Sequence, residues 1–163
     1  MEATCRRALE LGLPAIAFTE HADFVTVHEG QHELDVEGYL AAVEHCRSGY
    51  PHLRILSGVE LGEPHLYPTA AAAVLAAGRL DRVLGSVHCI SIDGKLHDLS
   101  ERGLMTREAA PGHFRAYLTE LLAMVRSSQP YEVLAHLDYP RRYWPHAELA
   151  LDEADFEEEY RAV

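Results

Sequence analysis

The chain has 163 residues, of which 48% are hydrophobic and 25% are charged. This composition indicates a soluble globular protein, and the length suits one domain with a substantial core. The net charge of −12 argues against a nucleic-acid-binding surface, which would need a basic patch. The three cysteines lack a CxxC spacing, which argues against a disulfide framework and fits a cytoplasmic location. The most apolar stretch, residues 70–77, is too short to span a bilayer, so we expect no contact with a membrane.

Helix-like and strand-like stretches alternate along the chain. In chain order, the apolar spacing and end signals predict helices over residues 2–12, 36–46, 69–77, 111–127 and 152–163. Apolar runs between them predict strands over residues 15–21, 54–60, 82–90 and 131–137. Gly12 suits the end of the first helix, Asp35 can cap the second, and Asp93-Gly94 indicates a turn in a loop after the third strand. This alternation predicts an α/β fold with a parallel sheet or a barrel.

The number of repeats suggests a partial barrel. Four βα units make half of a (β/α)₈ barrel, and the chain starts and stops inside predicted helices. We therefore expect residues 1–163 to form a single, incomplete domain, either a fragment or the product of a gene model begun at an internal methionine. The sheet edges exposed by such a cut could pair with another copy, so self-association is expected.

Four strand ends carry side chains that can bind metal ions. His21, Glu60, His88 and His136 each close one of the four apolar runs. In a parallel α/β fold these ends lie on one face, where ligands and catalytic groups collect. Three imidazoles and one carboxylate are a ligand set suited to zinc, manganese or iron. Each residue alone has an ordinary alternative, a hydrogen-bonded core histidine or a glutamate paired with arginine, but four successive coincidences favour a metal site.

Other polar residues follow the same strand ends. Arg141 and Arg142 come shortly after His136. A guanidinium group can donate two parallel hydrogen bonds to the oxygens of one phosphate, which favours phosphate binding. The alternative is that the two arginines form ordinary salt bridges. His65 and His97 are predicted to lie in loops that could line the pocket, and we assign His65 to substrate binding. Five more histidines are predicted to face solvent, namely His28, His32, His45, His52 and His146.

These motifs together resemble the PHP (polymerase and histidinol phosphatase) family of metal-dependent phosphoesterases. The resemblance covers nearly the whole chain and is carried by residues 15–24 (AIAFTEHADF), 58–60 (GVE), 84–88 (LGSVH) and 135–138 (AHLD). The last two motifs, with residues 141–143 (RRY), are most similar to the histidinol-phosphatase branch.

The resemblance implies a distorted (β/α)₇ barrel that holds up to three metal ions. Glu60 would bridge two ions, His88 and His136 would bind one of that pair, and His21 would serve the third. The family's first strand carries His-x-His and its last carries Asp-x-His. These strands are expected before Met1 and after Val163, and the chain as written is therefore expected to be a poor phosphatase.

The implied activity is phosphomonoester hydrolysis of a small phosphorylated substrate. L-Histidinol phosphate, an intermediate of histidine biosynthesis, is the leading substrate. Alternatives are another PHP phosphoesterase, an inactive metal-binding or regulatory remnant, and the PHP domain attached to a DNA polymerase. The acidic balance of the chain weighs against the last.

Overall fold

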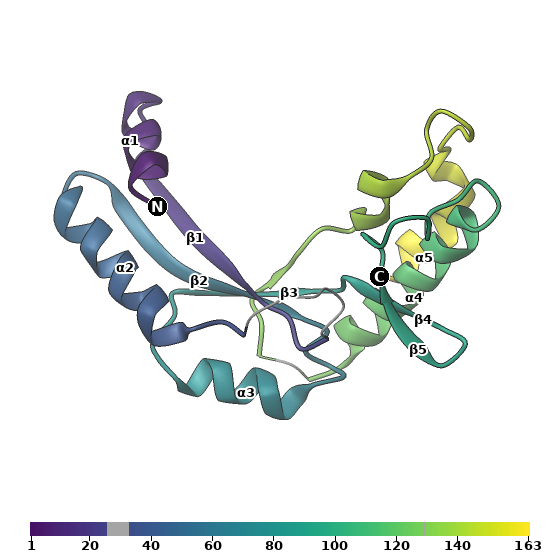
Figure 1. The fold of residues 1–163 in the computed structure, drawn as a ribbon, viewed down its shortest axis with the longest axis horizontal. Helices are drawn as coiled ribbons and strands as arrows, with labels where there is room; N and C mark the ends of the chain where they lie inside the picture. Colours follow the sequence, from purple (N-terminus) through teal and green to yellow (C-terminus); the bar gives the residue numbers. More distant parts are fainter. Residues whose placement is uncertain (26–32, 129) are drawn as a thin grey trace.

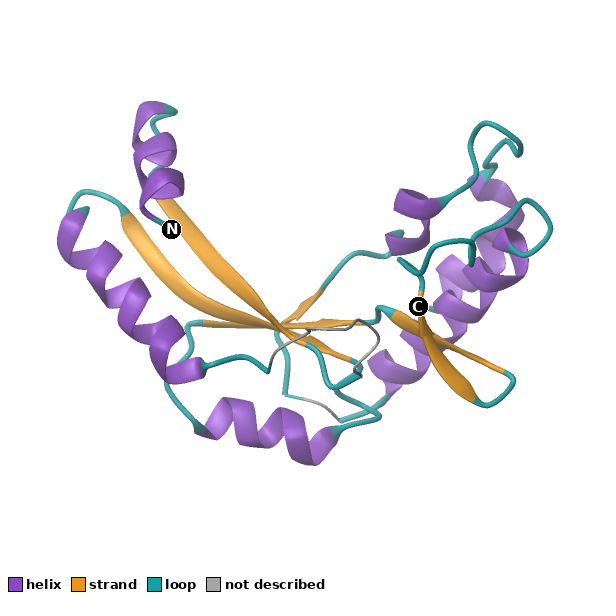
Figure 2. Ribbon diagram, in the orientation of Figure 1, coloured by secondary structure: helices purple, strands orange, loops and turns teal. Residues whose placement is uncertain are grey.

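The computed structural model describes residues 1–25, 33–128 and 130–163. Figures 1 and 2 show a parallel sheet flanked by helices, with further helices and a hairpin grouped at one end of the molecule. The helices are α1 (Glu2–Glu10), α2 (Val36–Gly49), α3 (Pro68–Ala76), α4 (Ala110–Arg126) and α5 (Glu157–Ala162), with 3-10 turns at Tyr139–Tyr143 and Glu153–Phe156. The strands are β1 (Ala15–Ala22), β2 (Arg54–Gly62), β3 (Arg82–Ser86), β4 (Cys89–Ile92), β5 (Lys95–Asp98) and β6 (Val133–Leu134). The predicted α/β class is confirmed.

The main sheet has the order β1-β2-β3-β6, and all neighbouring strands in it are parallel. The register places His21 directly opposite Glu60 on the two longest strands. Parallel neighbours in chain order require helical crossovers, which α2 and α3 provide between β1, β2 and β3. The carboxyl ends of all four strands therefore lie at one edge of the sheet, which positions the candidate site.

Local signals in the sequence set several element ends. The Asp35 carboxylate accepts a hydrogen bond from the Gly38 N–H at 3.0 Å and caps α2, as predicted. Gly12 follows α1 with a φ of 69°, a left-handed conformation that glycine adopts without steric cost. The last helix begins later than predicted, because residues Glu153–Phe156 form a 3-10 turn before α5 starts.

The third predicted strand is too long. β3 ends at Ser86, and the chain then leaves the parallel sheet to form an antiparallel β4–β5 hairpin. The predicted Asp93-Gly94 turn is confirmed as the tip of this hairpin, with φ of 50° and 76°, as a two-residue hairpin turn requires. The expected loop around this turn is wrong, since His97 lies on β5.

The fourth predicted strand is also too long, because only Val133 and Leu134 form β6. These two residues pair with Leu84 and Gly85 of β3, and single hydrogen bonds from Glu132 N to the Val83 oxygen and from Ala135 N to the Gly85 oxygen flank the pairing. The Tyr131 ring packs on Gly85, where an added Cβ would approach the ring to 2.7 Å. His136 consequently follows the strand by two residues.

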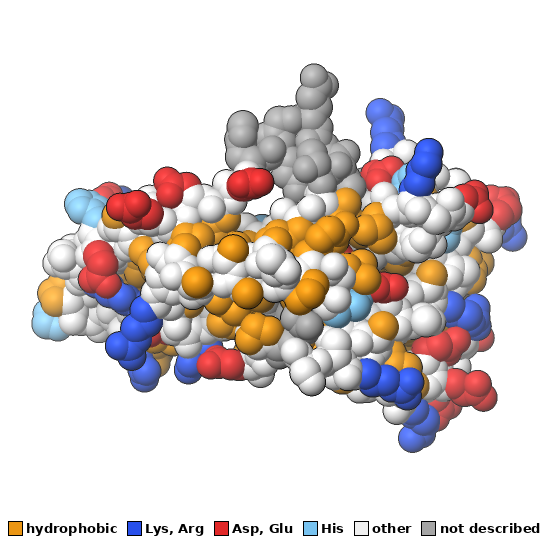
Figure 3. Space-filling view, turned by 90° about the horizontal axis from the view of Figure 1, so that it is seen from below, with side chains coloured by type: hydrophobic (Ala, Val, Ile, Leu, Met, Phe, Trp, Pro, Cys, Tyr) orange, Lys and Arg blue, Asp and Glu red, His pale blue; other side chains and the backbone are white. Residues whose placement is uncertain are grey.

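Two sides of the molecule are packed differently. The larger core surrounds α4, whose buried residues are Ala110, Phe114, Tyr117, Leu118, Leu121 and Met124. The alanine-rich α3 buries only Ala71, and Figure 3 shows hydrophobic side chains gathered in a band on the face where this helix lies. Among the described helices, none combines the length and apolar character needed to cross a membrane.

Candidate metal centre

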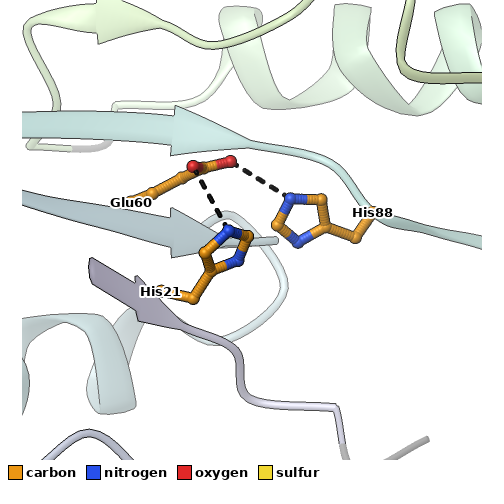
Figure 4. A group of neighbouring side chains, drawn as sticks. All are labelled: His21, Glu60 and His88. Carbon is orange, nitrogen blue, oxygen red and sulfur yellow. Dashed lines mark hydrogen bonds and ion pairs between the residues drawn. The ribbon is translucent and has the colours of Figure 1, made fainter. Parts of the chain in front are cut away.

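The parallel sheet brings the four predicted ligand residues together. His21 lies on β1 and Glu60 on β2, while His88 and His136 each follow their strand, β3 or β6, by two residues. Figure 4 shows the side chains of His21, Glu60 and His88 pointing toward one another at the strand ends. The predicted convergence of the four residues at one edge is confirmed. Their role as metal ligands stays a prediction.

Glu60 is the centre of this cluster. Its Oε1 lies 3.1 Å from His88 Nε2 and 3.1 Å from His136 Nε2, and its Oε2 lies 3.7 Å from His21 Nε2. The side chains of Glu60 and His88 are 12% and 5% exposed, so this carboxylate is largely withdrawn from water. As predicted, His88 and His136 lie closest to Glu60. The two oxygens of one carboxylate thus face different histidines.

The spacing of these atoms fits a divalent transition ion. One ligand atom from each of His21, Glu60 and His88 lies within 4.8 Å of the others. Nitrogen and oxygen ligands about 2.1 Å from a tetrahedral zinc ion would be separated by ~3.4 Å, close to the distances around Glu60. Imidazole nitrogens with a carboxylate are also ligands of manganese and iron. The residues therefore fit the expected group in both chemistry and spacing.

Asp23 is a member of the site that the sequence analysis did not identify. Its Oδ1 lies 2.8 Å from His88 Nδ1, and its Oδ2 lies 3.3 Å from His21 Nδ1. A carboxylate on the far nitrogen of a histidine fixes the tautomer and ring orientation that a metal ligand needs. The His-x-Asp spacing of residues 21–23 was the available clue in the sequence.

Hydrogen bonds within the cluster shift the pKa values of Glu60, Asp23 and His88. Burial disfavours the ionised form of Glu60, but hydrogen bonds from His136 and His88 outweigh burial and hold the pKa of Glu60 well below its usual range. The same balance, with hydrogen bonds from His21 and His88, lowers the pKa of Asp23. For His88, burial lowers the pKa, yet Asp23 and Glu60 raise it to about 10. In the absence of a metal ion these interactions favour a protonated His88 between two carboxylates, and a metal ion bound at His88 Nε2 would displace that proton.

Two tyrosines, Tyr117 and Tyr139, contact His136. The Tyr117 hydroxyl of α4 donates a hydrogen bond to the His136 carbonyl oxygen at 2.5 Å and lies 3.1 Å from His136 Nδ1. The Tyr139 ring stacks on the His136 ring with centroids 4.8 Å apart and also lies 5.0 Å from the His88 ring. Neither tyrosine was identified from the sequence, because each contact depends on how distant elements pack.

Glu63 is a further buried carboxylate beside the cluster. It is 1% exposed and accepts hydrogen bonds from the main-chain N–H groups of His88 and Cys89. Burial raises the pKa of Glu63, and the two N–H groups oppose that rise. This residue contacts the backbone of a candidate ligand and not its ring.

A cavity of about 400 Å³ opens next to His136. Its lining residues are His136, Asp138, Tyr139, Arg141, Arg142 and His146. The Arg142 guanidinium lies 5.6 Å above the Tyr139 ring, and Arg141 forms an ion pair with Glu153. The predicted arginine pair therefore lies beside His136 and the candidate metal-ligand cluster. That either arginine binds substrate stays a prediction.

His65 and His97 lie apart from this cavity. His65 Nε2 contacts Glu120 Oε1 at 2.6 Å, and the His65 side chain is only 6% exposed and does not line the cavity. His97 contacts Glu101 on the hairpin side at 3.1 Å. His45, His52 and His146 are exposed, as predicted, while His28 and His32 lie outside the described residues.

A family model described as PHP domain matches residues 1–162. The chain is 29% identical over 128 residues to a probable histidinol-phosphatase of Clostridium acetobutylicum, covering 78% of this chain and 47% of that protein. It is 28% identical over 150 residues to a histidinol-phosphatase of Lactococcus lactis subsp. lactis, covering 91% of this chain and 54% of that protein. The chain thus spans about half the length of the curated relatives it matches.

Two crystal structures share the fold. One is a histidinol phosphate phosphatase of Lactococcus lactis subsp. lactis complexed with zinc, L-histidinol and phosphate, with a TM-score of 0.81 and 24% identity. The other is a putative histidinol phosphatase of Listeria monocytogenes, with a TM-score of 0.78 and 16% identity. Each match covers 99% of this chain, and the matched parts are 59% and 68% of those chains. At these identities the likeness shows the architecture of the sheet and its helices.

Proposed function

Because this chain belongs to the PHP domain family, we propose that it carries the metal centre of a phosphomonoester hydrolase that acts on L-histidinol phosphate. The observation that carries the proposal is the approach of three imidazole nitrogens to the two oxygens of Glu60, with distances of 3.1 to 3.7 Å. The names of both sequence relatives support the choice of substrate.

The two sides of Glu60 suggest how metal ions would be held. His88 and His136 face Oε1 and would bind one ion with it, whereas His21 faces Oε2 and would serve another. Up to three divalent ions are proposed for the family site. Zinc, manganese and iron all suit these ligands, and zinc is supported by the complex of the Lactococcus structure. Such an ion, when bound, supplies positive charge for the phosphate oxygens and activates water for attack on phosphorus.

The residues of this chain would orient the ligands and receive the phosphate. Asp23 holds the rings of His21 and His88 through their Nδ1 atoms, so that Nε2 of each ring points to Glu60. The Tyr139 ring stacks on His136, and the Arg142 guanidinium lies over the same Tyr139 ring. This cation–π contact places a positive charge beside the cluster. Guanidinium groups pair with phosphate oxygens and stabilise charge that develops on them. We propose Arg141 and Arg142 as phosphate-binding residues, with Arg141 exchanging its Glu153 partner for substrate.

The test measures phosphate release from L-histidinol phosphate by the zinc- or manganese-loaded protein. Glu60→Gln and His88→Ala should abolish turnover and weaken zinc binding. Two exposed control substitutions, Glu158→Gln and His45→Ala, should leave both properties unchanged. Zinc binding through Glu60 without turnover would favour the inactive metal-binding alternative. Turnover that survives both cluster variants would contradict the proposed site.

A further inference from the structure

Glu63 occupies an unusual position directly after β2. Its φ of 45° lies in the left-handed region, which residues other than glycine and asparagine adopt at an energetic cost. Its N–H donates to the Ser86 carbonyl at 2.9 Å, which ties it to the end of β3. The whole residue is 1% exposed, so its carboxylate has been withdrawn from water. A buried carboxylate needs strong partners to remain there.

The partners of this carboxylate are main-chain groups of the candidate metal ligand. Glu63 Oε1 accepts hydrogen bonds from His88 N at 2.5 Å and from Cys89 N at 2.8 Å. These N–H groups lie at the junction where the chain leaves β3 and enters the β4–β5 hairpin. His88 and Cys89 are only 4% and 2% exposed, and buried N–H groups must find acceptors inside the protein.

The remaining polar atoms of His88 are held as well. Its carbonyl oxygen accepts a hydrogen bond from Leu99 N at 3.1 Å. Its Nδ1 contacts Asp23, and its Nε2 contacts Glu60. The Glu63 carboxylate therefore supplies the contact that fixes the N–H side of this residue. A shift of the His88 backbone would move Nε2 away from the shared oxygen of Glu60.

We propose that Glu63 is a positioning residue, whose carboxylate anchors the His88 backbone so that the His88 ring is presented to a metal ion. This inference rests on the proposed function. It explains why a strained, buried glutamate follows β2, where a glycine would adopt the backbone conformation more easily. Residues that orient metal ligands typically change metal affinity by about 10–100-fold when they are replaced.

Two substitutions separate positioning from general stability. Glu63→Gly removes the carboxylate but relieves the φ of 45°, so the fold should be retained. Glu63→Gln keeps an oxygen that can accept both N–H groups, so it should preserve the anchor. Val43→Ala is the control, because Val43 is fully buried in a separate core cluster beneath α2 and its truncation lowers stability without touching His88.

The measurements are zinc affinity by calorimetry and amide hydrogen exchange of His88 and Cys89 in the metal-free protein. Glu63→Gly should weaken zinc binding by about 10–100-fold and speed both exchanges, whereas Glu63→Gln should stay within about threefold of the wild type. Val43→Ala should keep the wild-type zinc affinity.

Zinc binding by Glu63→Gly at the wild-type level would overturn this proposal alone. An equal loss of affinity in Val43→Ala would also overturn it, since the loss would then follow stability. Failure of the wild-type protein to bind zinc would overturn the proposed function together with this inference.

Discussion

Replacing Tyr117 by phenylalanine tests whether α4 stabilises the site through one hydroxyl group. The Tyr117 ring is fully buried in the core around α4, and phenylalanine keeps that packing. The substitution removes the hydrogen bond to the His136 carbonyl oxygen at 2.5 Å. A buried hydrogen bond of this kind contributes about 1–2 kcal/mol to the free energy of unfolding. For a chain of this length, that loss lowers the melting temperature by about 2–8 °C.

The assay is urea denaturation of the metal-free protein, followed by circular dichroism, so that bound ions do not contribute. Tyr131→Phe is the matched control, because its hydroxyl lies 3.4 Å from the Met124 carbonyl oxygen and makes a weak contact at best. The control should change the free energy of unfolding by less than about 0.5 kcal/mol. Equal stabilities of the two variants would refute the argument that the Tyr117 hydroxyl holds His136.

Three further changes have expected outcomes. Hydrogen bonds from Ser57 and Arg47 lower the pKa of Asp81, so Asp81 stabilises the fold above the usual aspartate pKa and this contribution is lost as pH falls through the lowered value. Asp81→Asn should therefore cost about 1–2 kcal/mol at pH 7 in urea denaturation, and the difference should shrink in acid. Gly94→Ala should lower the free energy of unfolding by about 1–2 kcal/mol, because alanine adopts the φ of 76° only with strain. The added Cβ meets no atom within 4 Å, so no clash contributes, and an unchanged melting temperature would contradict this prediction. Asp23→Asn should weaken zinc binding by about 10–100-fold in calorimetry, and unaltered affinity would exclude an orienting role.

The sequence predicted the parts of the fold that depend on local patterns. β1, β2 and helices α1 to α4 follow from apolar runs, and the Asp35 cap and the Asp93-Gly94 turn follow from the conformations those residues favour. The convergence of His21 and Glu60 also follows from the sequence, since parallel strand ends share an edge.

The contacts that hold the ligands could not be predicted in the same way. Asp23 reaches His88 across 65 positions of the chain, and Glu63 reaches the His88 backbone across 25. Such pairings depend on where β3 ends, and an apolar run continuing to Ile90 concealed that end. The chain turns into the hairpin at Cys89, which points the main-chain N–H groups of His88 and Cys89 toward Glu63. This orientation is a consequence of tertiary packing and not of residue preference.

The most direct test of the central claim is an anomalous diffraction map of crystals grown with zinc. The account predicts a peak about 2.0–2.2 Å from a Glu60 oxygen and from Nε2 of His88 and of His136. The same map for Glu60→Gln should lose that peak. A zinc peak at the His97–Glu101 pair of the hairpin, with none beside Glu60, would contradict the account.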